Sequence, residues 1–100
     1  MQVTKEKNDK TLVVTVTGQL DTNTAPTLEA EIMSDISSVS ELRLEIKGLD
    51  YISSAGLRVL LITHKTMAAK SGKFIVLHPC DEVMEILDMT GFSSFLEIEE

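Results

Sequence analysis

The chain is 100 residues long, and its share of 43% hydrophobic and 25% charged residues is typical of a soluble globular protein. This length suits one hydrophobic core rather than two, so we expect a single domain over residues 1–100. The formal net charge of −7 argues against direct binding to nucleic acid or to an anionic membrane surface, because basic patches supply most of that attraction.

Cysteine content and hydropathy exclude several further classes of protein. Cys80 is the only cysteine, so neither an internal disulfide nor a thiolate metal cluster can form. No apolar run approaches the ~18 residues of a membrane-spanning helix, and the N-terminus lacks the apolar segment of a secretion signal. We therefore expect a cytoplasmic protein without a membrane span. A Gly-rich nucleotide-binding loop is also absent, and we expect no cofactor and no metal.

The first two elements in the chain are predicted to be strands. Residues 2–7 alternate weakly between polar and apolar types, which predicts an edge strand. The run 12–17 is rich in β-branched residues and predicts a second strand, whose alternate side chains face opposite sides of the sheet. We expect Gly18 to end it.

A helix and a third strand are predicted next. Pro26 suits the first turn of a helix over residues 25–37, and either Asn23 or Thr24 is a suitable N-cap. Residues 42–47 alternate strictly between apolar and charged types. This pattern indicates a strand in a sheet that is covered on one face and more open on the other.

The second half of the chain continues the alternation of helices and strands. The patterns predict a helix over 54–70, a buried strand over 74–77, a helix between Pro79 and Gly91, and a last strand over 95–98. The order β-β-α-β-α-β-α-β predicts an α/β fold with a four- to five-stranded mixed sheet and with helices mostly on one face.

The connection between the third strand and the second helix carries the strongest functional signal. Residues 50–57 read Asp-Tyr-Ile-Ser-Ser-Ala-Gly-Leu, so the hydroxyls of Ser53 and Ser54 lie where a strand turns into a helix. The first amides of a helix lack internal partners, and the positive end of the helix dipole faces outward. A serine there can cap the helix, and a phosphate attached there would find a favourable field. Taken alone, the pattern favours a plain N-cap.

The order of elements, the Gly18-x-Leu20-Asp21 connection and the turn over 50–57 together resemble the STAS domain. More specifically, the chain resembles the single-domain bacterial anti-anti-sigma factors, also called anti-sigma factor antagonists. In that family a serine at the start of the second helix is phosphorylated by an anti-sigma factor that is also a serine kinase of the histidine-kinase-like ATPase type. A metal-dependent serine phosphatase removes the phosphate. The resemblance implies both partners for this chain.

The resemblance assigns the phosphorylated position to Ser54, with Ser53 as the second choice. The usual order in the family is an acid, the modified serine, then Ser or Thr, then Gly-Leu. Ala55 therefore stands at the small polar position, and Gly56 matches. Ser53 replaces the usual acid, and this departure bears on the contacts with the kinase.

The function implied by the resemblance is a phosphorylation-controlled exchange of partners. The unmodified protein would bind the anti-sigma factor and release a sigma factor, and phosphorylation would block that binding. The implied contact residues are Asp21, Thr22, Asn23, Ser53, Ser54, Ala55, Gly56 and Arg58. Asp21 is also suited to stabilising its own turn. The alternative function is a STAS module that is not phosphorylated and serves as a scaffold or small-molecule-binding adaptor in a larger assembly.

An enzyme is the other class that the sequence raises. Ser54 lies at a strand-to-helix turn, as the nucleophile of an α/β-hydrolase does, but the required Gly-x-Ser-x-Gly is absent because Ile52 stands two residues before it. Neither histidine is placed as a base, since His64 falls on the apolar side of its helix and His78 in a loop. We therefore predict no catalytic residues and no enzymatic activity.

Overall fold

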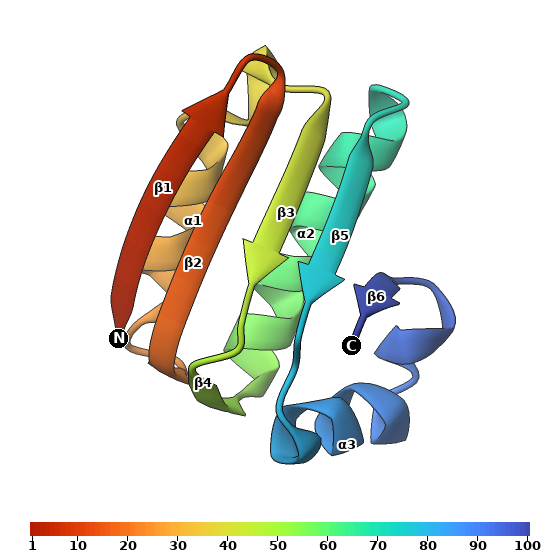
Figure 1. Cartoon of the computed structure of the whole chain (residues 1–100). Helices are drawn as coiled ribbons and strands as arrows, with labels where there is room; N and C mark the ends of the chain where they lie inside the picture. The colour runs from red at the N-terminus through yellow and green to blue at the C-terminus, as the bar shows by residue number, and fades with distance from the viewer.

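The computed structural model describes all 100 residues and contains six strands, three α-helices and two short 3-10 turns (Figure 1). The strands are β1 (Gln2–Asn8), β2 (Thr11–Leu20), β3 (Glu41–Glu45), β4 (Leu49–Ile52), β5 (Lys73–Leu77) and β6 (Glu97–Glu99). The helices are α1 (Ala25–Met33), α2 (Ser54–Ala69) and α3 (Asp81–Met89), and the 3-10 turns are Ile36–Ser38 and Phe92–Ser94. The predicted order of elements is confirmed, with β4 as an addition.

The strands form one mixed sheet in the order β1-β2-β3-β5-β6, and β4 pairs with the end of β2. β1 is antiparallel to β2, whereas all the other pairs are parallel. Parallel neighbours need crossover connections, and the three helices supply them. Figure 1 shows α1 and α2 behind the sheet, with α3 at its lower end. The prediction of a mixed sheet with helices mostly on one face is confirmed.

The core lies between the sheet and the two helices behind it. The apolar residues that alternate along β2 and β3 face this core, as predicted, and α1 and α2 complete it from the other side. Members that are at most 1% exposed include Leu12, Val14, Val16, Leu28, Ile32, Leu42, Leu44 and Leu60. Burial of each of the larger side chains contributes roughly 1.5–3 kcal/mol, which holds the helices against this face.

β2 is longer than predicted, because Gly18 does not end it. The strand continues to Leu20 after a shift in register between Gly18 and Gln19. Gly18 has a φ of +93°, a left-handed conformation that glycine adopts far more readily than other residues. A bulge at this glycine therefore turns the end of β2 away from β3 and towards β4.

β4 is a strand that the sequence pattern did not predict. Leu49 and Ile52 are buried while Asp50 and Tyr51 between them are exposed, so the strand lacks the alternation that marked β2 and β3. Its pairing with the end of β2 fixes the backbone immediately before Ser53. The first residues of the turn expected over residues 50–57, as far as Ile52, are therefore part of a strand of the sheet.

α1 is shorter than the helix predicted over residues 25–37. It ends at Met33, and a separate 3-10 turn follows at Ile36–Ser38. The Ser34 hydroxyl donates to the Glu31 carbonyl at 3.0 Å, a local bond by which serine competes with continuation of a helix. The last strand also begins later than predicted, at Glu97, because Phe92–Ser94 form a 3-10 turn.

The edge strand β1 is connected to α1 by an ion-pair cluster that should respond to acid. Lys5 Nζ lies 2.9 Å from Glu31 Oε2 and 2.9 Å from Asp35 Oδ2. The hydrogen bond from Lys5 holds the pKa of the Asp35 carboxyl below its usual value. A lowered folded-state pKa contributes stability above the unfolded pKa, and this contribution is lost as the pH falls through the folded value.

In the wild type the free energy of unfolding should fall with acidification below about pH 4, the ordinary pKa of aspartate. We expect Asp35→Asn to make this fall less steep. The effect should be small because the three side chains are partly exposed. Urea unfolding at a series of pH values measures it. An unchanged slope in the variant would mean that the pair adds no pH-dependent stability.

Candidate functional site

The two adjacent serines at the start of α2 have different structural roles. Ser53 is the N-cap residue, and its hydroxyl accepts a hydrogen bond from the Gly56 amide at 3.4 Å. The Ser53 amide donates to the Leu20 carbonyl at 2.8 Å, which fastens this residue to the end of β2. Ser54 is the first residue of the helix and is exposed. The plain N-cap suggested by the pattern is thus Ser53, and Ser54 is left accessible.

Removal of the capping hydroxyl should cost stability without removing the exposed serine. Ser53→Ala is expected to destabilise the protein by about 0.5–1 kcal/mol, the lower part of the usual range, because the capping bond is long. Thermal or urea unfolding measures this loss. Ser54→Ala is the matched control and should change the unfolding free energy by less than about 0.5 kcal/mol, since an exposed side chain is deleted there. Equal losses in both variants would contradict the assigned roles.

Gly56 allows α2 to approach the sheet closely. It is buried, and a Cβ at this position would lie 2.7 Å from both Ile52 Cγ1 and Leu20 Cγ. Such contacts are closer than packed carbon atoms tolerate. Gly56 therefore has a packing role in the domain, which the sequence did not predict. The partner contact predicted at Gly56 stays a prediction, and this packing role stands beside it.

Asp21 organises the loop between β2 and α1. Its Oδ1 accepts hydrogen bonds from the amides of Asn23 at 2.9 Å and Thr24 at 3.1 Å. In return, the Thr24 hydroxyl accepts from the Asp21 amide at 2.8 Å and donates to the Gln19 carbonyl at 2.9 Å. Thr24 occupies the N-cap position of α1 but makes no capping bond to that helix. The turn-stabilising role predicted for Asp21 is therefore present, and Thr22 and Asn23 are exposed at the tip of the loop.

The loop, α1 and the first turns of α2 border one groove of about 230 Å³. It is lined by Thr22, Ala25, Pro26 and Glu29 on one side and by Ala55 and Arg58 on the other. Three of the predicted contact residues, Thr22, Ala55 and Arg58, thus lie around the same hollow. Arg58 is exposed and takes part in none of the four ion pairs of the protein. No sequence pattern marked Glu29, which joins the groove through the packing of α1 against α2.

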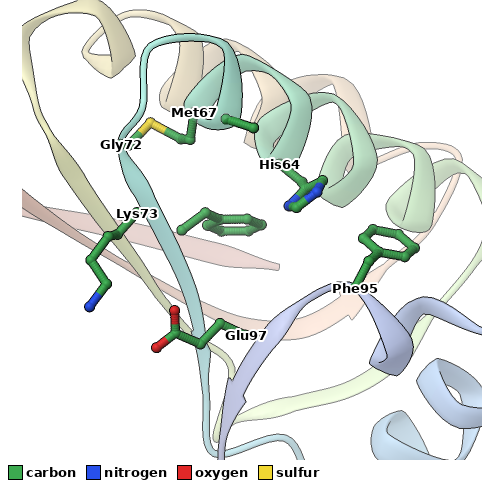
Figure 2. Close-up of a pocket in the computed structure, with 8 residues that line it drawn as sticks. His64, Met67, Gly72, Lys73, Phe95 and Glu97 are labelled. Carbon is green, nitrogen blue, oxygen red and sulfur yellow. The ribbon is translucent and has the colours of Figure 1, made fainter.

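A second hollow, of about 180 Å³, lies between α2 and strands β5 and β6 (Figure 2). His64 and Phe95 lie next to each other in its lining, with ring centroids 5.0 Å apart and planes inclined by 54°. His64 is half-buried, so the prediction of a packed histidine agrees with this geometry. No group of three His, Cys, Asp or Glu side chains is placed to hold a metal ion. None of the helices has the length and apolar character needed to cross a membrane.

Comparison with known families decides what kind of domain this is. The family model of the STAS domain matches residues 2–100. The chain belongs to the STAS domain family. Among curated relatives of this STAS domain is BtrV of Bordetella bronchiseptica, which is named as an anti-sigma factor antagonist and is 33% identical over 98% of this chain and 85% of its own length. The anti-sigma-B factor antagonist of Bacillus subtilis is 24% identical over 98% of this chain and 90% of its own length.

Solved structures show the same STAS fold. An anti-sigma factor antagonist from Mycobacterium paratuberculosis, 25% identical, superposes with a TM-score of 0.87 over 98% of this chain and 84% of its own. The antagonist SpoIIAA in its unphosphorylated form, 20% identical, gives 0.81 over 99% of this chain and 88% of its own. The resemblance drawn from the order of elements, the Gly18-x-Leu20-Asp21 connection and the turn over 50–57 is therefore confirmed, and the relatives described here bear the name of anti-sigma factor antagonists.

Proposed function

We propose that this STAS domain is an anti-sigma factor antagonist whose choice of partner is controlled by phosphorylation of Ser54. In its unmodified form it binds an anti-sigma factor that is also a serine kinase, and a sigma factor is released. The observation that carries the proposal is the exposed Ser54 at the first position of α2. It directly precedes Ala55, which lines a groove together with Thr22 and Arg58. The names of BtrV and of the Bacillus subtilis relative support it.

Phosphorylation acts through charge, without a rearrangement of the fold. A phosphate adds about −1.5 to −2 charges and three strong acceptors at the start of α2. The helix terminus favours an anion, so the domain stays folded. Bacillus SpoIIAA, whose fold this chain shares with a TM-score of 0.78, is known in a phosphorylated form, which supports this tolerance. Against a partner, however, the dianion has to lose its water, and a penalty of ~3–4 kcal/mol weakens binding some hundreds-fold.

The partners supply the chemistry of this cycle, and the domain acts by binding alone, in the cytoplasm. The kinase transfers the terminal phosphoryl group of ATP to the Ser54 hydroxyl, and a metal-dependent serine phosphatase returns the hydroxyl. Ser53 is the second candidate for modification, but its hydroxyl caps α2 and its backbone is fastened to β2. The docking surface around Ser54 is framed by Asp21, Thr22, Asn23, Ala55 and Arg58.

One observation favours a second candidate function. Ser53 stands where an acid is usual in the family, and a domain without that carboxylate could serve as a scaffold or adaptor that is not phosphorylated. Affinity capture from source cells, with the bound proteins identified by mass spectrometry, separates the two. Recovery of a histidine-kinase-like ATPase supports the antagonist, whereas recovery of transporter or scaffold subunits in its place supports the adaptor.

A further inference from the structure

Ser54 and Arg58 lie one turn apart on the exposed side of α2. Residues separated by four positions on a helix are neighbours, with Cβ atoms about 5–6 Å apart. Both residues are exposed, and Arg58 has no carboxylate within ion-pair distance. The guanidinium is therefore an uncommitted cation within reach of any group attached to the Ser54 hydroxyl.

The carboxylates around the groove leave this cation available. Glu29 of α1 lines the same groove but forms no ion pair with Arg58. Asp21 is engaged by the backbone amides of its own turn. A phosphate on Ser54 competes well with either carboxylate, because it carries up to two negative charges and can accept two parallel hydrogen bonds from a guanidinium. An anion four residues before a cation is also the favourable orientation on a helix.

We infer that Arg58 binds the phosphate on Ser54 within the same domain and is thereby withdrawn from the docking surface. The inference rests on the proposed function, in which Ser54 is the modified residue. Phosphorylation then has two effects on a partner, since a dianion is added to the surface and a cation is removed from it. The unmodified domain presents Arg58 to an acidic group of the partner, and the modified domain satisfies Arg58 internally.

The direct test needs neither the kinase nor the partner. Phosphoserine is incorporated at position 54 during translation, and the ³¹P resonance is titrated in the wild type, in Arg58→Gln and in Lys65→Gln. A bound guanidinium stabilises the dianion, so the second pKa of the phosphate should lie about 0.2–0.4 lower in the wild type than in Arg58→Gln. Lys65→Gln, which removes an exposed cation three turns along the same helix, should leave it unchanged. Equal pKa values in the wild type and Arg58→Gln overturn the inference.

A second readout uses the partner and separates this inference from the proposed function. Unmodified Arg58→Gln should bind the kinase about 10-fold more weakly than the wild type, while the phosphorylated forms of the two proteins should differ by less than about threefold. The affinity of the unmodified form divided by that of the phosphorylated form should therefore be smaller in Arg58→Gln than in the wild type. If the ratio of the unmodified to the phosphorylated affinity is the same in Arg58→Gln as in the wild type, the inference is overturned. The proposed function still stands in that case, provided that phosphorylation blocks binding. The opposite result is a phosphate pKa lowered by Arg58 in a domain that no kinase modifies. That result supports the pairing of Arg58 with the phosphate and contradicts the proposed function.

Discussion

The domain with phosphoserine at position 54 is expected to bind its kinase partner several hundred-fold more weakly than the unmodified domain. The phosphate would be attached at the first residue of α2, directly before Ala55, which lines the groove with Thr22 and Arg58. A partner docked on this surface would have to desolvate it. A penalty of ~3–4 kcal/mol corresponds to a loss of this size. Isothermal titration calorimetry of both forms against the same kinase measures the ratio of dissociation constants directly.

Phosphoserine at position 37 is the matched control for this experiment. Ser37 is exposed in the 3-10 turn that follows α1, at the end away from the groove, so the same charge is added at a distance from the docking surface. This form should bind within about threefold of the unmodified domain, because exposed charges beyond about 10 Å are largely screened at physiological salt. Comparable losses from positions 37 and 54 would show that net charge, and not the site, controls binding.

Replacement of Gly56 is expected to cause the largest loss of stability at the site. The added methyl group of Gly56→Ala would lie 2.7 Å from atoms of Ile52 and Leu20, which are only 2% and 0% exposed and have little room to retreat. Overpacking of this kind costs about 1–3 kcal/mol, and the better helix propensity of alanine returns at most about 1 kcal/mol. We expect a net loss of about 1–2 kcal/mol and a Tm about 5–15 °C lower.

Two further variants sharpen this prediction. Gly56→Val adds two more methyl groups against the same neighbours and should lose more stability than Gly56→Ala. Ala55→Ser adds one oxygen at the adjacent position, which borders the groove, and should stay within about 0.5 kcal/mol of the wild type. Urea unfolding of the four proteins gives the order. A Gly56→Ala protein as stable as the wild type would show that α2 does not need its close approach to the sheet.

The parts of the fold that the sequence predicted are those that local patterns determine. Alternation along β2 and β3, and helical spacing in α2, reflect which face of each element is buried, so a single sequence contains that information. β4 is different, because its four residues do not alternate and its pairing depends on a bulge at Gly18 more than thirty residues earlier in the chain. The pairing of β4 with the end of β2 is a tertiary contact between distant parts of the chain, so no local sequence pattern predicts it.

The candidate site also contains features that local sequence patterns predict and features that depend on tertiary contacts. A motif at a strand-to-helix turn was enough to single out the serine pair, but both hydroxyls were equally suitable caps until the backbone placed the start of α2 between Ser53 and Ser54. The burial of Gly56 follows from side chains of two separate strands, which no local pattern around residue 56 contains. The same is true of Glu29, which reaches the groove only because α1 packs beside α2.

The central claim is that the Ser54 hydroxyl is the one that a cognate kinase modifies. The domain is incubated with that kinase and ATP, and the phosphate is located by mass spectrometry of its peptides, with Ser54→Ala run in parallel. We expect one phosphate, on Ser54, and none on the variant. A phosphate on Ser53, or an unmodified domain that nonetheless binds the kinase tightly, would contradict the account.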